Sequence, residues 1–105
     1  MLVTIEDRFL GEVAVYNWEY KGKSPYPVGV IKAFKRRLSQ IQSAKNTSDL
    51  RNINSLNFEK LNEPKYRGKY SIRLNKAYRL IFRIENVKDE KVEIICIEEI
   101  TNHYS

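Results

Sequence analysis

The apolar positions of the first fifty residues predict a short strand followed by two helices. Residues 2–5 form an apolar run that could begin a sheet. Residues 9–16 fit a helical stripe, although Val13 and Val15 also fit one face of a strand, and we favour the helix. The clearest helix begins at Pro27, a residue suited to the first helical position because that position needs no N–H. Its apolar side chains then recur at helical spacing, at Ile31, Phe34, Leu38 and Ile41.

Turn-forming residues separate these elements. Two prolines and a glycine make residues 21–27 a linker. Further on, Thr47, Ser48 and Asp49 are candidate N-caps for a helical turn around Leu50. Residues 52–69 are polar and rich in Asn, so we expect a long surface loop, and such loops are often functional.

From Tyr70 onward the apolar period changes from helical spacing to two. Residues 70–74 and 78–84 alternate, and Asn75-Lys76 between them predicts a tight antiparallel hairpin. Residues 86–90 form a second polar turn, and residues 92–97 are nearly all apolar, as a central strand should be. The order of elements predicts an α+β fold in which helices cover one face of an antiparallel sheet.

Length and composition restrict the class of protein. The chain has 105 residues, 42% of them hydrophobic, which fits one domain and excludes a disordered tail. It lacks an apolar run of membrane-spanning length and a signal-peptide pattern, so we expect a soluble cytosolic domain without a membrane partner. One cysteine, Cys96, excludes an internal disulfide, and one histidine, His103, cannot complete a Cys/His zinc site. We therefore expect no metal and no cofactor.

The net charge of +6 conceals an uneven distribution. Residues 21–83 hold sixteen basic and three acidic residues, a net +13, whereas the other 42 residues carry a net −7. A basic block of this kind attracts polyanions by neutralising phosphates and releasing counterions. The alternative is a solvated basic surface without a partner.

The predicted hairpin gathers arginines on one side. If Tyr70, Ile72 and Leu74 face the core, then the opposite face carries Arg73, Arg79 and Arg83, flanked by Lys69 and Lys76. Cations on neighbouring strands repel unless an anion lies among them, and arginine offers a planar donor fork suited to phosphate. Either a phosphate ligand or the chain's own Glu85, Glu98 and Glu99 could supply that anion.

Four side chains could transfer protons beside these arginines: His103, Tyr104, Tyr70 and Glu98. A histidine near the C-terminus is more often simply exposed. However, a strand ending there could return it to the arginine-bearing face. Arginines that clamp a phosphate, with proton-transfer groups nearby and no metal site, describe a metal-independent ribonuclease that drives a ribose 2′-OH into the adjacent phosphorus.

Three segments also resemble a known family: Gly68–Asn75 (GKYSIRLN), Tyr78–Phe82 (YRLIF) and Glu98–Tyr104 (EEITNHY). Residues 21–23 (KGK) and 56–61 (LNFEKL) add to the likeness. Together they are similar to the HigB-like branch of the RelE/ParE superfamily of toxins, over almost the whole chain. The resemblance implies one toxin domain over residues 1–105, with a compact sheet packed on two N-terminal helices.

The resemblance also implies an activity and its partners. These are metal-independent cleavage of messenger RNA in the A site of the 70S ribosome, and inhibition by a helix-turn-helix, HigA-like antitoxin within a hetero-oligomer. By motif match, Arg79 stabilises the transition state and Arg73 contacts the RNA backbone, while His103 and Tyr104 resemble the C-terminal catalytic ending. Further RNA-binding candidates are Lys65, Arg67, Lys69, Tyr70, Lys76 and Arg83.

The sequence departs from the family pattern at one position. Some HigB toxins carry a histidine before the long loop, where this chain has Glu59-Lys60. Either Glu59 or Lys60 could replace it, or the mechanism could depend on the arginines and the C-terminal tail. Two alternative functions would use the same scaffold. The chain could be a ParE-like inhibitor of DNA gyrase, which does not cleave RNA. It could also be a non-toxic module that binds nucleic acid without cleaving it.

Overall fold

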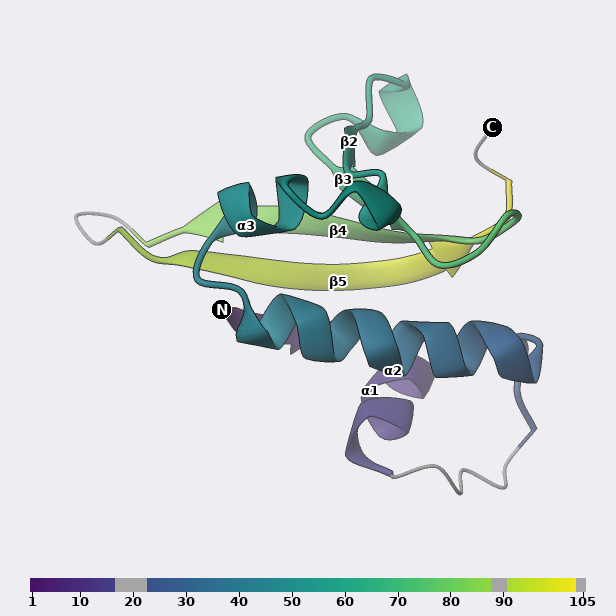
Figure 1. Ribbon diagram of the computed structural model, residues 1–105. Helices are drawn as coiled ribbons and strands as arrows, with labels where there is room; N and C mark the ends of the chain where they lie inside the picture. The colour runs from purple at the N-terminus through teal and green to yellow at the C-terminus, as the bar shows by residue number, and fades with distance from the viewer. Residues whose placement is uncertain (17–22, 88–90, 104–105) are drawn as a thin grey trace.

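Helices cover one face of a five-stranded sheet (Figure 1) in the computed structural model, which describes residues 1–16, 23–87 and 91–103. The helices are α1 (Arg8–Val15), α2 (Val28–Ser43) and α3 (Thr47–Arg51), with short 3₁₀ turns η1 (Asn54–Leu56) and η2 (Pro64–Tyr66). The strands are β1 (Leu2–Ile5), β2 (Glu59–Lys60), β3 (Tyr70–Arg73), β4 (Arg79–Asn86) and β5 (Glu93–Thr101). The predicted α+β class is confirmed. Within the described residues, no helix combines the length and apolarity that crossing a bilayer requires.

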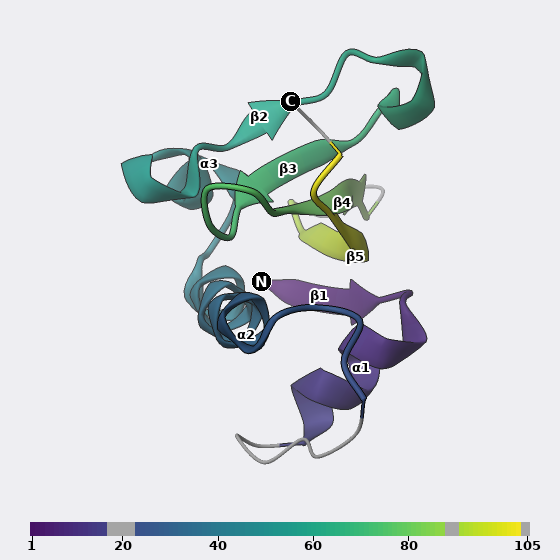
Figure 2. The same ribbon diagram turned by 90° about the vertical axis from the view of Figure 1, so that its right-hand side faces the viewer.

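The strands lie in the order β1-β5-β4-β3-β2. The predicted β3–β4 hairpin and its antiparallel neighbour β5 are present, but β1 pairs parallel with β5 and so joins the two ends of the chain in one sheet. Figure 2 shows α2 and α3 on the same side of this sheet. The predicted apolar stripe of α2 faces the sheet and is buried there. It shares one core with side chains of β4 and β5, among them Leu80, Phe82 and Ile95.

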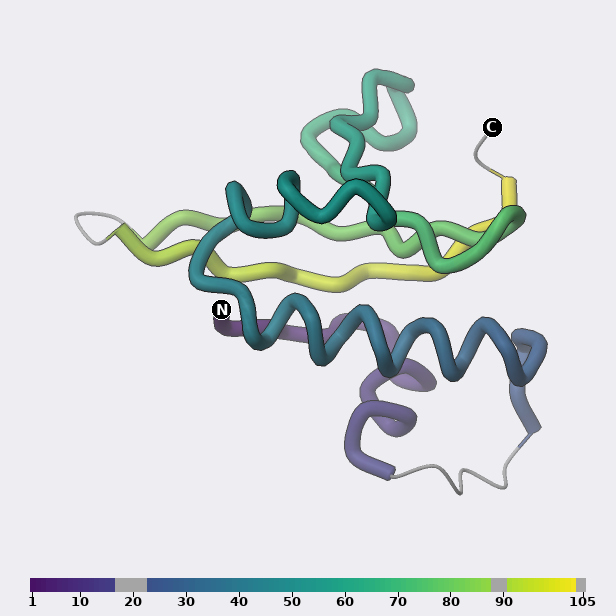
Figure 3. Tube along the Cα trace, viewed as in Figure 1, coloured from purple at the N-terminus to yellow at the C-terminus, as the bar shows by residue number. Residues whose placement is uncertain are grey.

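The segment from residue 52 to residue 69 is more ordered than the predicted surface loop. It holds η1 and η2, and β2 pairs with β3 at the edge of the sheet. Figure 3 shows this segment leaving α3 and folding back toward β3. The physical reason is burial, because Leu56, Leu61 and Tyr66 are all inside the protein and tie the polar stretch to the sheet.

Three local predictions need correction. Pro27 is the N-cap residue of α2 rather than its first helical residue, with φ −56° and ψ 150°. The N-cap of α3 is Asn46, whose Oδ1 accepts from the N–H of Asp49, so none of the three residues that follow it is the cap. The hairpin connection is longer than two residues, since the N–H of Leu74 donates to the carbonyl of Tyr78.

A β-bulge in the β4–β5 pairing sets which β5 side chains enter the core. Phe82 pairs with Ile97, but Ile81 pairs with Glu99, so Glu98 is an extra residue in the ladder. Strand side chains alternate between faces, and Ile97 and Ile100 would point to opposite sides without this insertion. With it, both are buried in one core.

We predict that Phe82→Ala lowers the free energy of unfolding by about 3–5 kcal/mol, because it empties a fully buried site in the middle of the sheet. The ring of Phe82 packs against those of Phe58 and Tyr70, at centroid distances of 5.7 and 6.1 Å. Urea unfolding followed by circular dichroism measures the change. Val28→Ala is the control, at a side chain that is 73% exposed, and should change stability by less than about 0.5 kcal/mol. Equal losses in the two variants would contradict this account of the core.

Candidate functional site

Two pairs of cations lie across β3 and β4 on the face of the sheet opposite the helices, which we call the arginine face. Arg73 is the direct partner of Arg79. The second pair lies four residues away along both strands. Tyr70 pairs with Phe82, so Lys69, just before Tyr70, lies beside Arg83, just after Phe82. Facing cations destabilise a sheet unless negative charge lies near them. The structure meets this requirement differently at the two pairs.

The chain's own carboxylates neutralise the pair of Lys69 and Arg83. Glu98, turned to this face by the bulge, lies 2.5 Å from Lys69 Nζ through one oxygen and 2.5 Å from Arg83 Nη1 through the other. Arg83 Nη2 also contacts Glu6 at 2.8 Å and Glu85 at 3.1 Å. At this pair the anion is therefore supplied by the chain's own Glu98 and Glu85, as one of the two alternatives from the sequence predicts.

The ionisation of this cluster follows from its contacts. Burial of Glu98 opposes its negative charge, but hydrogen bonds from Lys69 and Arg83 outweigh burial and lower the pKa of the carboxyl. Hydrogen bonds to Glu6, Glu85 and Glu98 raise the pKa of the Arg83 guanidinium. A nucleic acid that recruits Lys69 or Arg83 must therefore compete with Glu98.

The pair of Arg73 and Arg79 opens instead onto a hollow of about 310 Å³, the arginine hollow. Its lining residues come from the hairpin and from the segment around β2: Asn57, Glu59, Arg73, Asn75, Lys76, Ala77 and Arg79. Among these side chains three are cationic and one, Glu59, is a carboxylate. The hollow is thus a net positive site that is large enough to admit a phosphate group and has the donor chemistry that suits one.

Arg79 is held firmly at the wall of the arginine hollow. Its side chain is only 12% exposed. Nε donates to Ser71 Oγ at 2.8 Å, and Nη2 donates to the carbonyl of Asn57 at 2.6 Å. Glu59 Oε2 lies 3.8 Å from Nη2, beyond hydrogen-bond distance. These contacts fix the orientation of the guanidinium before any ligand arrives.

Arg73 and Lys76 are the exposed cations of the same hollow. Arg73 Nε donates to the carbonyl of Asn75 at 3.2 Å, and the carbonyl of Arg73 accepts from Arg37 Nε at 3.1 Å. Burial, with the neighbouring charge of Arg36, lowers the pKa of Arg37. Helix α2 thus adds positive charge beside the rim.

An apolar patch lies between the two cation pairs. Ile81, midway between Arg79 and Arg83 on β4, is covered by Leu61 and Tyr66. The 3₁₀ turn η2 that carries Tyr66 exposes Lys65, whose Nζ lies 5.3 Å from the Tyr66 ring centroid, and is followed by the exposed Arg67. The structure therefore places both residues above the arginine face.

Tyr70 does not join these cations. It pairs with Phe82 on the core side of the sheet, where its ring stacks on Phe82 and packs at 5.6 Å from Phe58. The alternation along β3 that turns Ser71 and Arg73 to the arginine face turns Tyr70 away from it.

The chain approaches the arginine hollow again at the end of β5. Thr101 is the register partner of Arg79, and His103 follows two residues later with an exposed side chain. The N–H of His103 donates to Thr101 Oγ1 at 3.1 Å. Figure 1 shows this end of β5 at the same end of the sheet as the β3–β4 connection. Tyr104 lies outside the described residues.

Several residues that hold the site escaped prediction from the sequence. Ser71 and Asn57 fix Arg79, and the side chain of Asn75 accepts from the N–H groups of Ala77 and Tyr78 to shape the turn. The serine within an otherwise apolar and basic strand could have indicated a hydrogen-bond partner for an arginine on the same face of the neighbouring strand. Among the described residues, no three His, Cys, Asp or Glu side chains gather as metal ligands. The expected absence of a metal stays a prediction.

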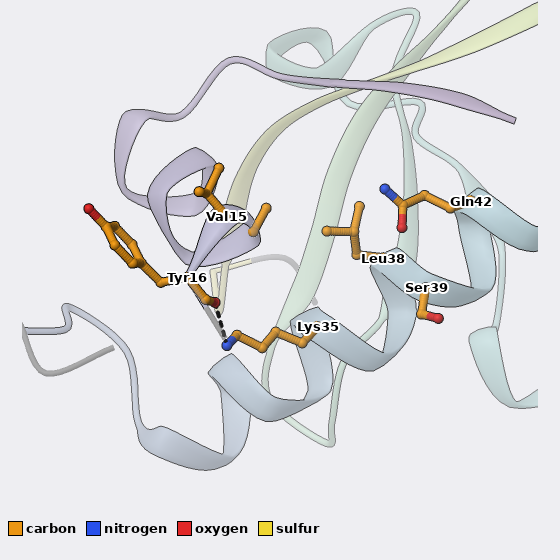
Figure 4. Close-up of a pocket in the computed structure, with 7 residues that line it drawn as sticks. Val15, Tyr16, Lys35, Leu38, Ser39 and Gln42 are labelled. Atoms are coloured by element: carbon orange, nitrogen blue, oxygen red, sulfur yellow. Dashed lines mark hydrogen bonds between the residues drawn. The ribbon is translucent and has the colours of Figure 1, made fainter. Parts of the chain in front are cut away.

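A second hollow, of about 370 Å³, lies between the end of α1 and α2 (Figure 4). Lys35 reaches across it and donates to the carbonyl of Tyr16 at 2.9 Å. The other labelled lining residues are Val15, Leu38, Ser39 and Gln42. This set lacks a carboxylate, a histidine and a second cation, so the arginine hollow is the better candidate for chemistry.

We predict that Glu98→Gln destabilises the protein by about 1–3 kcal/mol at pH 7, because Lys69 and Arg83 lose their shared carboxylate. Since folding lowers the pKa of Glu98, its stabilisation is complete above the ordinary value of 4.5 and is lost as the pH falls through the folded-state pKa. Unfolding measured from pH 7 to pH 3 should show the difference between variant and wild type shrink below about pH 4.5.

Glu12→Gln is the matched control for Glu98→Gln. Glu12 is an exposed carboxylate that lies 3.6 Å from Arg8 in α1, a contact worth only about 0.3–0.5 kcal/mol. A difference for Glu98→Gln that stays constant down to pH 3 would contradict the electrostatic account.

Comparisons with known proteins agree with this fold. A model of the HigB-like toxin family, described as a RelE-like toxin of the type II toxin–antitoxin system HigB, matches residues 10–94. An uncharacterised protein of Haemophilus influenzae is 43% identical over 63 residues. That match spans 60% of this chain and only 61% of the relative's length.

Two solved structures share the architecture. A YoeB/ParE toxin from Agrobacterium tumefaciens has a TM-score of 0.60 at 10% identity, covering 99% of this chain and 100% of that one. A chain of a YoeB-YefM complex from Staphylococcus aureus has a TM-score of 0.50 at 20% identity, covering 99% of each chain. At these identities the likeness concerns the fold alone, whereas the family match covers most of the sequence. The chain belongs to the HigB-like family of RelE-like toxins from type II toxin–antitoxin systems.

Proposed function

We propose that this toxin is a ribosome-dependent endoribonuclease that cuts translated messenger RNA in the A site. The observation that carries the proposal is the arginine hollow, where Arg73, Arg79 and Lys76 line a space large enough to admit a phosphate group and part of its nucleotide. The membership of the chain in the HigB-like family supports it.

The chemistry needs no metal. The ribose 2′-oxygen attacks the neighbouring phosphorus while the bond from phosphorus to the 5′-oxygen breaks, which leaves a 2′,3′-cyclic phosphate and a 5′-hydroxyl. Negative charge develops on the phosphorane oxygens, and donors fixed in advance stabilise it best. Arg79 meets that requirement because Ser71 and Asn57 already hold its guanidinium, while the more exposed Arg73 contacts the RNA backbone.

Glu59 is our candidate for the base that accepts the 2′-OH proton. It lines the arginine hollow, as the partner of Ser71 across β2 and β3. Lys60, the other residue that could stand in for the histidine of some HigB toxins, pairs with Tyr70 and so alternates to the opposite face. Geometry therefore favours Glu59 over Lys60.

For the acid that protonates the leaving 5′-oxygen we propose His103, with Tyr104 as the further candidate from the same tail. His103 is exposed just beyond Thr101, the register partner of Arg79. An imidazole titrates in the range that proton transfer near neutral pH requires.

The remaining cations would guide the RNA backbone. Lys65 on η2, Arg67 directly after it and Lys76 on the hairpin turn are exposed and free to approach phosphates. Lys69 and Arg83 first have to leave Glu98. Binding through such contacts weakens steeply as salt increases.

We also propose a cognate helix-turn-helix, HigA-like antitoxin that binds this chain in a hetero-oligomer in the cytoplasm. One of the structures with this fold is a complex of YoeB with YefM, which supports a protein partner for the present chain. Sequestration would keep the toxin from ribosomes until the antitoxin is lost.

We predict that induced expression of the wild type arrests growth and creates new RNA ends within translated messages. Arg79→Ala should lower the cleavage rate by at least about 100-fold, because one fixed donor to the transition state is lost. Mapping of RNA ends after induction measures this. Arg8→Ala is the matched control, since Arg8 has a side chain that is 95% exposed on α1, and it should cleave as the wild type does.

The other outcomes separate the alternatives. Growth arrest with DNA-damage signalling and intact messages in both wild type and variant would indicate a gyrase inhibitor. Harmless wild-type expression with salt-dependent nucleic-acid binding would indicate a non-toxic binding module.

A second prediction concerns the partner. We expect the neighbouring reading frame to encode a small helix-turn-helix protein. Its co-expression should restore growth, and the two chains should purify together by gel filtration. Growth arrest that persists although both proteins are made in equal amounts would exclude that protein as the antitoxin.

A further inference from the structure

Asn57 has an unusual backbone conformation at the wall of the arginine hollow. It ends η1 with φ 46° and ψ 56°, and among the described residues it is the one non-glycine residue with positive φ. Asparagine tolerates this left-handed region better than most residues do. Its neighbours explain the turn, because Leu56 is fully buried and Phe58 packs between Tyr70 and Phe82.

The left-handed turn aims the carbonyl of Asn57 at Arg79. The 2.6 Å hydrogen bond from Nη2 and the 2.8 Å bond from Nε to Ser71 Oγ hold two donor positions of the guanidinium. Nη1 has no partner among the described residues, so its N–H groups remain available to a ligand.

The side chain of Asn57 acts on the other charged group of the hollow. Its Nδ2 lies 3.5 Å from Glu59 Oε1, while the second oxygen of Glu59 stays 3.8 Å from Arg79 Nη2. A charge-assisted bond between guanidinium and carboxylate normally closes to about 2.7–2.9 Å. Glu59 and Arg79 therefore form an open ion pair without a direct hydrogen bond, and Asn57 contacts both.

We propose that Asn57 is a positioning residue that keeps the ion pair of Arg79 and Glu59 from closing to hydrogen-bond distance. Its carbonyl accepts from Arg79 Nη2, the nitrogen nearest Glu59, and its amide lies 3.5 Å from the other oxygen of Glu59. A closed pair would strengthen the attraction that offsets the charge of Arg79 and would engage the carboxylate that the proposed reaction needs. This inference rests on the proposed function, which assigns Arg79 to the phosphorane and Glu59 to the 2′-OH.

Asn57→Gly separates the two contributions, because glycine keeps the left-handed backbone and its carbonyl but removes the amide. We expect no loss of melting temperature and a cleavage rate on translated messages at least about tenfold lower. Association with ribosomes should not change. If Asn57 only capped η1, the glycine variant would instead cleave RNA as fast as the wild type does.

The positioning can be tested without RNA cleavage, by titrating inorganic phosphate into the purified protein and following the backbone N–H resonances of Ser71 and Arg79. Asn57→Gly should raise the dissociation constant for phosphate about fivefold or more, since Glu59 then competes for Arg79. The double variant Asn57→Gly, Glu59→Gln should bind phosphate as tightly as Glu59→Gln alone.

Unchanged phosphate affinity in Asn57→Gly, or an equal loss with and without Glu59→Gln, would overturn the inference. A wild type that binds phosphate as expected but cleaves no message would refute the proposed function instead. The two failures are thus distinguishable.

Discussion

The strict alternation of side chains along a strand is the constraint on which this structure depends. Strand β5 must bury Ile97 and Ile100 on the same side, although three positions separate them. The bulge at Glu98 resolves this conflict by adding one residue to the ladder. The same insertion turns a carboxylate toward Lys69 and Arg83, so a single irregularity completes the core on one face and balances charge on the other.

This arrangement gives the arginine face two unlike ends. At one end the cations cross-link β3, β4, β5 and the segment after β1 through Glu98 and Glu6, and so contribute to holding the sheet together. At the other end Arg73 and Arg79 border the arginine hollow with partners that are mostly neutral oxygens. A face of wholly unneutralised cations would weaken the fold, so the carboxylates at the first end offset the repulsion there.

Local pattern was enough to predict α2, the β3–β4 hairpin and the side to which its arginines point, since each depends on periodicity within one short segment. The parallel pairing of Leu2 with Ile94 depends on contacts across the whole chain, and the two-residue β2 forms only because buried neighbours hold it. The bulge lies in an apolar and acidic run without a turn residue to mark it. Within the site, the facing arginines were predictable, whereas the carbonyl of Asn57 and the left-handed turn that aims it were not.

The position of β5 between β1 and β4 affects how the molecule is made. A ribosome synthesises this strand after every other element of the sheet, yet it occupies an interior place. Until it emerges, β1 lacks its partner, and Arg79 lacks the neighbour that Thr101 provides. Such long-range pairing is slow and cooperative. A chain interrupted before β5 therefore cannot assemble the finished sheet, and the fold ties the assembly of its site to the synthesis of that strand.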